Sequence, residues 1–277
     1  MTQTISRPAS GAAAQRHGFT LVELLVAMAV GTIVIGCALA SLNALSNQWL
    51  VNSALVRSRA EARLTMDCLR RDLESALRAA PGDWLLLRPS TLATGGAPAS
   101  NELYLLATSQ DHTTNQLGDV WALGYALALA DPLNSGGPDP RRALYRLRLN
   151  PPDVFANGIE STDWWNLFWL PRRSGLDAPP NLLAQNAVFR CEAIVEDRAT
   201  KISHRVPLDR NVRINATGVV IDPPLAALQS SALRLTAINL SLVILRPEGL
   251  TLLRERQVLT DDQWRRFGDT FSERINF

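Results

Sequence analysis

Gly18-Phe-Thr-Leu-Val-Glu23 opens the stretch of sequence that decides the fold, and an apolar run from Leu24 to Leu42 completes it. The run contains no charged residue. A helix over this run would reach about 28 Å, because each residue of an α-helix adds about 1.5 Å of length. The hydrocarbon core of a bilayer is about 30 Å thick, so we predict a transmembrane helix over roughly residues 21–45.

Glu23 places a carboxylate at the start of this apolar helix. A charged side chain within hydrocarbon costs about 2.5 to 3.5 kcal/mol on insertion scales, and it is usually paired or functional. We therefore predict that Glu23 has a partner or a role in function.

Two other kinds of apolar segment fit this region less well. A cleaved signal peptide has an apolar core of about 7 to 15 residues followed by a small-residue cleavage site. Here the helical pattern continues far beyond Leu42. A plain signal anchor, which is a membrane helix without processing, stays open as an alternative.

The segment Arg16-His-Gly-Phe-Thr-Leu-Val-Glu23 resembles the processing segment of type IV prepilins and type II secretion pseudopilins. The resemblance implies that a prepilin peptidase cleaves between Gly18 and Phe19 and methylates the new amine of Phe19. Residues 1–18 would then be a leader peptide, and Glu23 would correspond to the assembly glutamate of the family. Because the peptidase works on the cytoplasmic face, the resemblance also implies a single-pass inner-membrane protein with a cytoplasmic N-terminus and a periplasmic or extracellular C-terminal domain.

The role of such a glutamate has a physical basis. Removal of a leader creates a charged amine at the end of an apolar helix, and an unpaired charge there is unfavourable. The Glu23 carboxylate, one turn further along, can neutralise this amine in its own chain or in a neighbouring subunit. Pairing between subunits would fix their axial stagger, because any other register leaves both charges unpaired in a low dielectric.

Two features depart from the pattern of major pilins. The leader is longer than their short basic leaders, and Ala40 stands where they often have a helix-bending proline. Only Gly31 and Gly36 weaken the helix, since a glycine costs about 1 kcal/mol relative to alanine in a helix interior. These departures favour a minor subunit.

The composition is that of a folded domain with balanced charge. The chain has 277 residues, of which 47% are hydrophobic and 19% are charged. Lys and Arg total 28 and Asp and Glu total 26, while the leader holds two arginines and no acid, so the remaining chain has a formal net charge of zero. This argues against a nucleic-acid partner, which requires a strongly basic surface.

The helical pattern continues beyond the membrane segment. One apolar stripe follows helical spacing and consists of Met66, Leu69, Leu73, Ala76 and Leu77. We predict a single helix over residues 19–80, which Pro81-Gly82 ends. The stripe is expected to pack on the chain's own C-terminal domain; a partner surface is the less favoured interpretation.

Charged residues occupy the other sides of this helix. Asp67 with Arg71, and Glu74 with Arg78, have the i, i+4 spacing of helical ion pairs.

From residue 82 onward the apolar period changes from 3.6 to 2, which indicates strands. The predicted strands are 84–88, 102–108, 120–129, 143–149, 165–170, 188–195, 218–221 and 233–245. In the fourth of these, Arg146 and Arg148 lie on one face and Tyr145 and Leu147 on the other, a half-buried pattern typical of antiparallel sheets. Thr260 and Gln263 form a capping box that predicts a short helix.

The predicted fold class is therefore α+β and pilin-like: a long N-terminal helix packed on an antiparallel β-sheet domain at 82–277. Scattered stretches of residues 63–245 resemble the larger minor members of the family, namely the J-type minor pseudopilin and the W-type minor pilin.

Three cysteines are present. Cys37 lies in the apolar run and is expected to pack as a small hydrophobic residue. Cys68 and Cys191 would both face an oxidising compartment, so a disulfide between them and two separate thiols both stay open.

The sequence contains no recognisable catalytic or cofactor motif. The histidines are His17, His112 and His204, and they belong to no metalloprotease, hydrolase or redox pattern. Asp111-His112 is interpreted as a solvated turn. We predict no cofactor and no small-molecule ligand.

A calcium-binding loop is the less favoured interpretation of one turn-rich segment. Asp131, Asn134 and Asp139 offer oxygen ligands for Ca²⁺, but their spacing does not match an EF-hand, and turn chemistry is the favoured interpretation.

The densest aromatic cluster outside the membrane segment is Trp164, Trp165, Phe168 and Trp169. Because both faces of this segment are apolar, core packing is favoured over a partner-binding surface.

Two functions follow. The first is a minor pilin or pseudopilin that assembles into, or primes, a type IV pilus-like or type II secretion filament, with prepilin peptidase, other pilins and the inner membrane as partners. The alternative is a membrane-anchored extracytoplasmic binding or enzymatic domain with no filament role.

Overall fold

The computed structural model describes residues 20–78, 82–90, 100–108, 120–129, 142–149, 151–156, 181–224, 232–256 and 259–277. The chain forms two compact units, Met1–Asn52 and Ser53–Phe277. One helix, α1 (Leu21–Glu74), contributes residues to both units.

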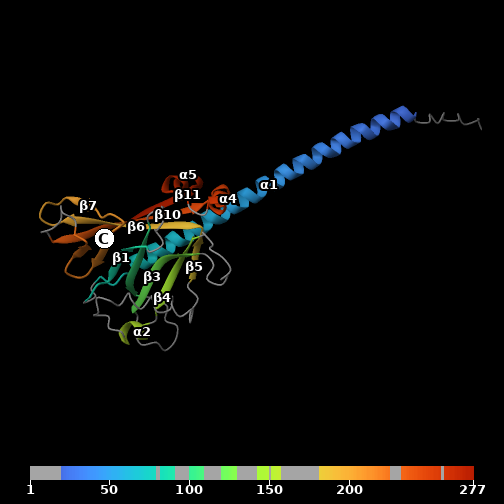
Figure 1. Cartoon of the computed structure of the whole chain (residues 1–277). Helices are drawn as coiled ribbons and strands as arrows, with labels where there is room; N and C mark the ends of the chain where they lie inside the picture. The colour runs from blue at the N-terminus through green and yellow to red at the C-terminus, as the bar shows by residue number, and fades with distance from the viewer. Residues whose placement is uncertain are drawn as a thin grey trace, which may run out of the picture. The chain divides into compact units, whose positions relative to one another are not determined.

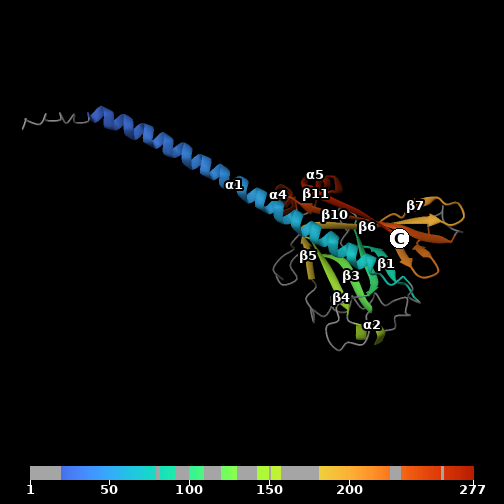
Figure 2. The same ribbon diagram turned by 180° about the vertical axis from the view of Figure 1, so that it is seen from behind.

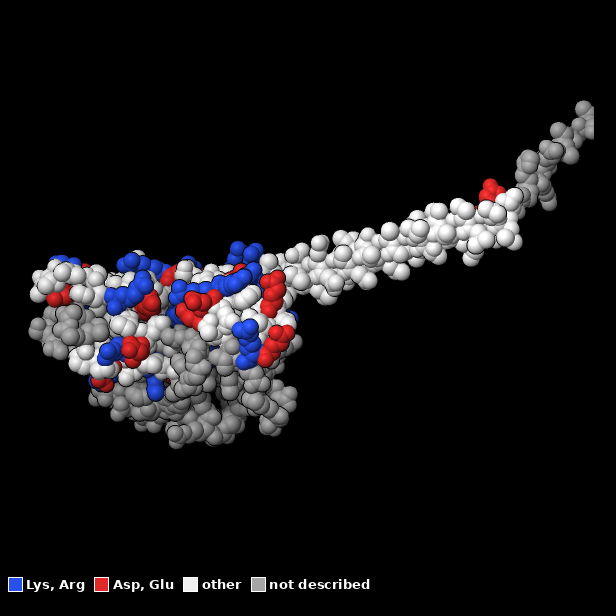
Figure 3. Space-filling view, turned by 45° about the horizontal axis from the view of Figure 1, so that its top comes forward, with Lys and Arg blue, Asp and Glu red and all other residues white. Residues whose placement is uncertain are grey.

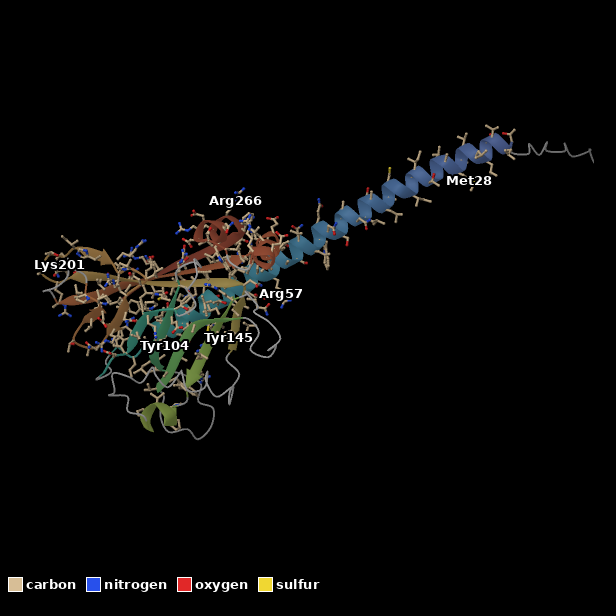
Figure 4. All side chains as sticks on the ribbon, in the orientation of Figure 1. Met28, Arg57, Tyr104, Tyr145, Lys201 and Arg266 are labelled. Atoms are coloured by element: carbon tan, nitrogen blue, oxygen red, sulfur yellow. The ribbon has the colours of Figure 1, made fainter. Side chains whose placement is uncertain are left out.

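The first part of α1 exposes its side chains. Every residue from Leu21 to Asn52 is exposed except Gly31, although most of them are apolar. Figure 4 shows these side chains, Met28 among them, extending outward from the helix. By length and composition α1 is able to cross a membrane.

The second part of α1, within the Ser53–Phe277 unit, buries one stripe. The buried residues recur at the three- and four-residue spacing of a helix face and are Ala62, Thr65, Met66, Leu69 and Leu73. The predicted packing of Met66, Leu69 and Leu73 on the chain's own domain is confirmed.

The helix ends at Glu74, before the predicted end at Ala80. The cause is competition from the neighbouring strand β2 (Asn101–Thr108) for backbone hydrogen bonds. Leu77 N–H donates to Leu106 O at 2.8 Å, and Thr108 N–H donates to Ser75 O at 3.0 Å. Ala76 forms an isolated bridge with Ala107, so this segment bonds to β2, and its apolar residues still pack against the core.

Seven strands form the larger sheet, which is called sheet A. Its order is β5-β4-β3-β2-β1-β8-β9, and every neighbouring pair is antiparallel. Its other strands are β1 (Leu85–Pro89), β3 (Val120–Leu129), β4 (Arg142–Leu149), β5 (Asn181–Gln185), β8 (Asn211–Ile214) and β9 (Val219–Asp222). Figure 1 shows β3 and β4 side by side in this sheet.

Four strands form sheet B, in the order β11-β10-β6-β7, again antiparallel. They are β6 (Ala187–Asp197), β7 (Ser203–Arg205), β10 (Leu233–Leu245) and β11 (Gly268–Asn276). Among the described residues the unit also contains three short helices: α2 (Pro151–Ala156), α4 (Pro247–Arg256) and α5 (Asp261–Phe267). The reverse view in Figure 2 shows α4 and α5 beside β10 and β11.

One hydrophobic core joins α1 to both sheets. It contains Leu69 and Leu73 of α1, Leu103 and Leu105 of β2, and Phe189 of β6. A smaller cluster under α4 and α5 includes Val243 and Trp264, and the predicted capping box of Thr260 and Gln263 begins α5. The predicted α+β class, with a long N-terminal helix packed on antiparallel sheets, is confirmed.

A side-chain amide links the two sheets. Asn101 of β2 accepts a hydrogen bond from Cys191 N–H at 2.7 Å through Oδ1, and its Nδ2 donates to Cys191 O. Asn101 is buried, so both amide groups of the pair are satisfied away from water.

The predicted strands that fall within the described residues match β1–β4, β6, β9 and β10, with small shifts at their ends. Segment 165–170 lies outside the described residues. The strand at 142–149 is more buried than its half-buried pattern suggested, because Arg142 to Tyr145 are buried. Arg146 does not face solvent: it lies beside Tyr125 in the ladder and contacts α1.

Four strands were not predicted: β5, β7, β8 and β11. β11 is the longest of them, and its sequence, Gly268-Asp-Thr-Phe-Ser-Glu-Arg-Ile-Asn276, has little apolar alternation. It pairs on one side only, with β10. An edge strand of this kind is specified by its neighbour more than by its own side chains.

Candidate assembly site

The N-terminus of α1 is built around a reciprocal pair of hydrogen bonds. Thr20 N–H donates to Glu23 Oε2 at 3.4 Å, and Glu23 N–H donates to Thr20 Oγ1 at 3.3 Å. This is a capping box, in which Thr20 is the N-cap and Glu23 is the third helical residue. It satisfies two backbone donors that a helix end otherwise leaves unpaired.

The capping box gives Glu23 a local partner. The carboxylate also lies at the positive end of the helix dipole, where a negative charge is favourable. Sequence reasoning missed this arrangement although Thr20-Leu-Val-Glu23 carries its signal, the same Thr-x-x-Glu/Gln spacing that correctly predicted α5. Glu23 remains exposed, and a carboxylate has acceptor sites for more than one donor.

The rest of the apolar segment keeps its hydroxyl groups internally bonded. Thr32 Oγ1 donates to Ala29 O at 2.8 Å, and Ser41 Oγ donates to Cys37 O at 2.9 Å. These groups therefore need no water. Figure 3 shows this segment as an uncharged surface with one acidic residue near its start, and Glu23 is the only charged residue from Leu21 to Asn52.

The second part of α1 is fixed to sheet A by a charged cluster. Arg146 Nε lies 2.8 Å from Asp72 Oδ2, and its Nη2 lies 2.9 Å from Asp72 Oδ1, so the pair is bidentate. Tyr125 donates its hydroxyl to Asp72 as well. Burial, followed by the charge of Asp72, raises the pKa of Tyr125 well above its usual value, which keeps the hydroxyl protonated and able to donate.

Ion pairs also join α1 to β11. Arg59 lies 3.9 Å from Asp269, and Arg70 lies 3.7 Å from Glu273. The predicted i, i+4 pairs within the helix are rearranged. Both Asp67 and Glu74 lie within 4 Å of Arg70, at 3.8 and 3.9 Å.

The partners predicted for Asp67 and Glu74 are engaged elsewhere. Arg71 donates to Asp67 O at 3.3 Å. Arg78, beyond the helix end, lies over the ring of Phe277 instead of one turn below Glu74.

The three cysteines are free thiols. Cys68 Sγ lies 3.6 Å from the hydroxyl of Tyr125, whereas Cys191 is buried in β6. Of the two alternatives that the sequence left open, the structure therefore has separate thiols and not a disulfide. Burial raises the pKa of Cys191 well above its usual value, so this thiol is unreactive in the folded domain.

Several predicted site residues lie outside the described residues. These are the processing residues Gly18 and Phe19, the pair Asp111 and His112, the loop residues Asp131, Asn134 and Asp139, and the aromatic cluster at 164–169. His204 lies in β7 and is half-buried. Within the described part of the chain, no group of three or more His, Cys, Asp or Glu side chains is arranged to hold a metal ion.

Comparison with known families identifies the N-terminal segment. Residues 14–38 match the family described as the prokaryotic N-terminal methylation motif. The match includes Gly18, Phe19 and Glu23, and it confirms the predicted resemblance to prepilin-type processing segments. With the exposed apolar helix that begins inside the matched segment, it points to a membrane-anchored structural protein.

Comparison with solved structures finds a type IV-like pilin from Thermus thermophilus. The two chains share 12% sequence identity. The matched region covers 78% of this chain and 93% of the Thermus thermophilus chain, and the TM-score is 0.33. A superposition of this quality supports no conclusion about fold or function. No curated protein matches the sequence.

Proposed function

We propose that this chain is a minor pilin or pseudopilin, a structural subunit that assembles into, or primes, a type IV pilus-like or type II secretion filament. One observation carries the proposal: the methylation motif at residues 14–38 contains the capped start of α1, where Glu23 is the only charged residue from Leu21 to Asn52.

The first step is insertion in the inner membrane. The helix crosses with its N-terminus in the cytoplasm, and the Ser53–Phe277 unit lies in the periplasm. The internally bonded hydroxyls of Thr32 and Ser41 make the segment compatible with hydrocarbon, where each unsatisfied polar group costs several kcal/mol.

The second step is processing. Prepilin peptidase cleaves between Gly18 and Phe19 and methylates the Phe19 amine, which leaves a positive charge next to the capping box. Glu23 uses Oε2 to accept from Thr20 N–H, so its other oxygen is available for an amine. Thr20 holds the glutamate backbone at the first turn and thereby restricts where the carboxylate lies.

The third step is assembly with other pilins. Leaving the membrane requires a new cover for the exposed apolar side chains from Leu21 to Val51. Helices of neighbouring subunits provide such a cover, and pairing of Glu23 with a neighbour's amine selects one register. The subunit performs no catalysis and needs no cofactor in this scheme.

Mass spectrometry of protein extracted from membranes tests the processing step. We expect a mature chain that begins with N-methylated Phe19. An intact Met1, or cleavage beyond Gly36, would contradict the proposal and favour a membrane-anchored binding or enzymatic domain.

Co-purification tests the assembly step. After crosslinking in cells, wild-type protein is expected to capture other pilins, and Glu23→Ala to be processed but captured poorly. Thr32→Ala is the matched control, because Thr32 lies on the same helix and its hydroxyl donates to the carbonyl of Ala29 in that helix. Equal capture by Glu23→Ala and wild type would contradict the role of Glu23.

A further inference from the structure

A small pocket lies in the Ser53–Phe277 unit, where the chain leaves α1. Its volume is about 190 Å³. Its lining includes three arginines from separate segments, Arg78, Arg198 and Arg234, together with the rings of Trp84 and Phe277. Figures 1 and 2 both show the C-terminus beside β1, the strand that follows Trp84.

The three arginines lack carboxylate partners within the described residues. Among the described residues, none of the three arginines forms an ion pair, either with an acidic side chain or with the terminal carboxylate of Phe277. No described Asp or Glu lines the pocket. Arg234 lies opposite Glu196 in the β6–β10 ladder, but the Glu196 carboxylate lies 3.6 Å from Lys201. The pocket therefore concentrates positive charge in a chain whose total charge is nearly balanced.

A larger cavity in the same unit shows the opposite arrangement. It has a volume of about 860 Å³ and is lined by Asp72, Trp121, Arg146 and Arg148, among others. Arg146 is held by Asp72, and the Arg148 guanidinium lies 3.4 Å from the centre of the Trp121 ring. Arg146 and Arg148 are thus engaged in packing, whereas in the smaller pocket, among the described residues, only Arg78 has such a contact, with the ring of Phe277.

The floor of the smaller pocket is held in place. Phe277 N–H donates to Thr236 O at 2.8 Å, and the Phe277 ring lies 6.1 Å from that of Trp84. The Arg78 guanidinium lies 4.7 Å from the centre of the Phe277 ring, a cation–π distance. The backbone of Arg198 is fixed too, since its N–H donates to Ala232 O at 3.2 Å.

We propose that this pocket binds an oxyanion group, such as a carboxylate, phosphate or sulfate. Guanidinium groups bind oxyanions through paired, charge-assisted hydrogen bonds. Several cations that line one pocket raise the local concentration of anions. The volume suits one compact group, because sites for drug-sized ligands begin at about 300 Å³.

The oxyanion has two sources, a free inorganic anion or an acidic side chain of another protein chain. Isothermal titration calorimetry of the full-length protein in non-ionic detergent, at constant ionic strength with chloride, distinguishes them. Sodium sulfate is the first probe, and a short capped peptide of two glutamates is the second. Saturable sulfate binding alone indicates a free anion, and tighter binding of the peptide indicates an acidic protein segment; either result supports the pocket.

The variant Arg198→Gln with Arg234→Gln tests the assignment. Both side chains are exposed, so the fold should persist, and an unchanged unfolding midpoint checks this. We expect binding at least about tenfold weaker, the equivalent of about 1.4 kcal/mol. Arg256→Gln, which changes an exposed arginine of α4 outside the pocket, should bind like wild type.

Arg198→Glu alone is the second variant, and it should abolish binding by reversing one charge. The proposal is overturned if wild-type protein shows no saturable binding of either probe, or if the Arg198 and Arg234 variants bind as tightly as Arg256→Gln.

Discussion

The two parts of α1 use one helix in two different ways. From Leu21 to Asn52 the apolar side chains are exposed, and Glu23 is the only charge. From Ser53 to Glu74 one stripe is buried, and charged residues cover the other sides. A continuous helix does not therefore imply one environment: the first part leaves its apolar side chains exposed, and the second part packs on the chain's own sheets.

A matched pair of leucines would show this difference most strongly. Leu69 is fully buried and Leu64, on the same part of the helix, is 67% exposed. Leu69→Ala should lower the free energy of unfolding by about 2 to 5 kcal/mol, because it leaves a cavity in the core. Leu64→Ala should change it by less than about 0.5 kcal/mol. Denaturant unfolding in detergent measures both, and equal losses would contradict the burial pattern.

The charged cluster under α1 offers the next largest effect. Asp72→Ala removes the partner of a half-buried arginine and should cost about 2 to 4 kcal/mol, which is less than the loss of about 3 to 5 kcal/mol for breaking a fully buried pair. Asp67→Ala is the control, since Asp67 forms only an exposed pair with Arg70.

A double-mutant cycle with Arg146→Met isolates the pair itself. A coupling energy near zero would show that the contact of Asp72 with Arg146 does not fix the helix to the sheet.

At the N-terminal end of α1 we expect a smaller loss of stability than for Asp72→Ala. Thr20→Ala removes the N-cap and should cost about 1 kcal/mol of local helix stability. Hydrogen exchange of the first-turn amides in detergent would report faster exchange at Leu21 to Glu23, with exchange in the sheets unchanged. Thr20→Ser keeps the hydroxyl and should preserve protection. Faster exchange throughout the sheets in Thr20→Ala would show that the two parts of the helix are not independent.

The smallest expected effect is on the stability of the folded domain at alkaline pH. Tyr125 has a raised pKa in the folded state, so its contribution to stability is complete below its unfolded pKa of about 10 and is lost as pH rises toward the folded value. Stability measured between pH 8 and 11 should fall more steeply in wild type than in Tyr125→Phe above about pH 10. Identical slopes would contradict the burial of a protonated Tyr125 beside Asp72.

Local patterns explain which parts of this structure could be predicted. The apolar run after Glu23, the buried stripe with Leu69, and the alternating residues of β10 each repeat over short distances along the chain. Contacts between distant residues leave no such signal: Asp72 and Arg146 are separated by 74 positions. The helix end at Glu74 was missed for the same reason, because β2 takes the hydrogen bonds that would have continued the helix.

The candidate site divides in the same way. The processing motif was predicted because the residues Gly18 to Glu23 are contiguous. The capping box was readable from Thr20 and Glu23 but was overlooked. The pocket with Arg78, Arg198 and Arg234 could not be read from the sequence, since folding alone brings these three segments together.

The amide link between Asn101 and Cys191 has a mechanical consequence. Tension along α1 would reach sheet A through Asp72 and Arg146, and sheet B through the ion pairs of β11. Because Asn101 joins the two sheets through paired hydrogen bonds, they share a pulling load instead of sliding past each other. The buried asparagine therefore adds a directional polar link to the hydrophobic core that the two sheets share.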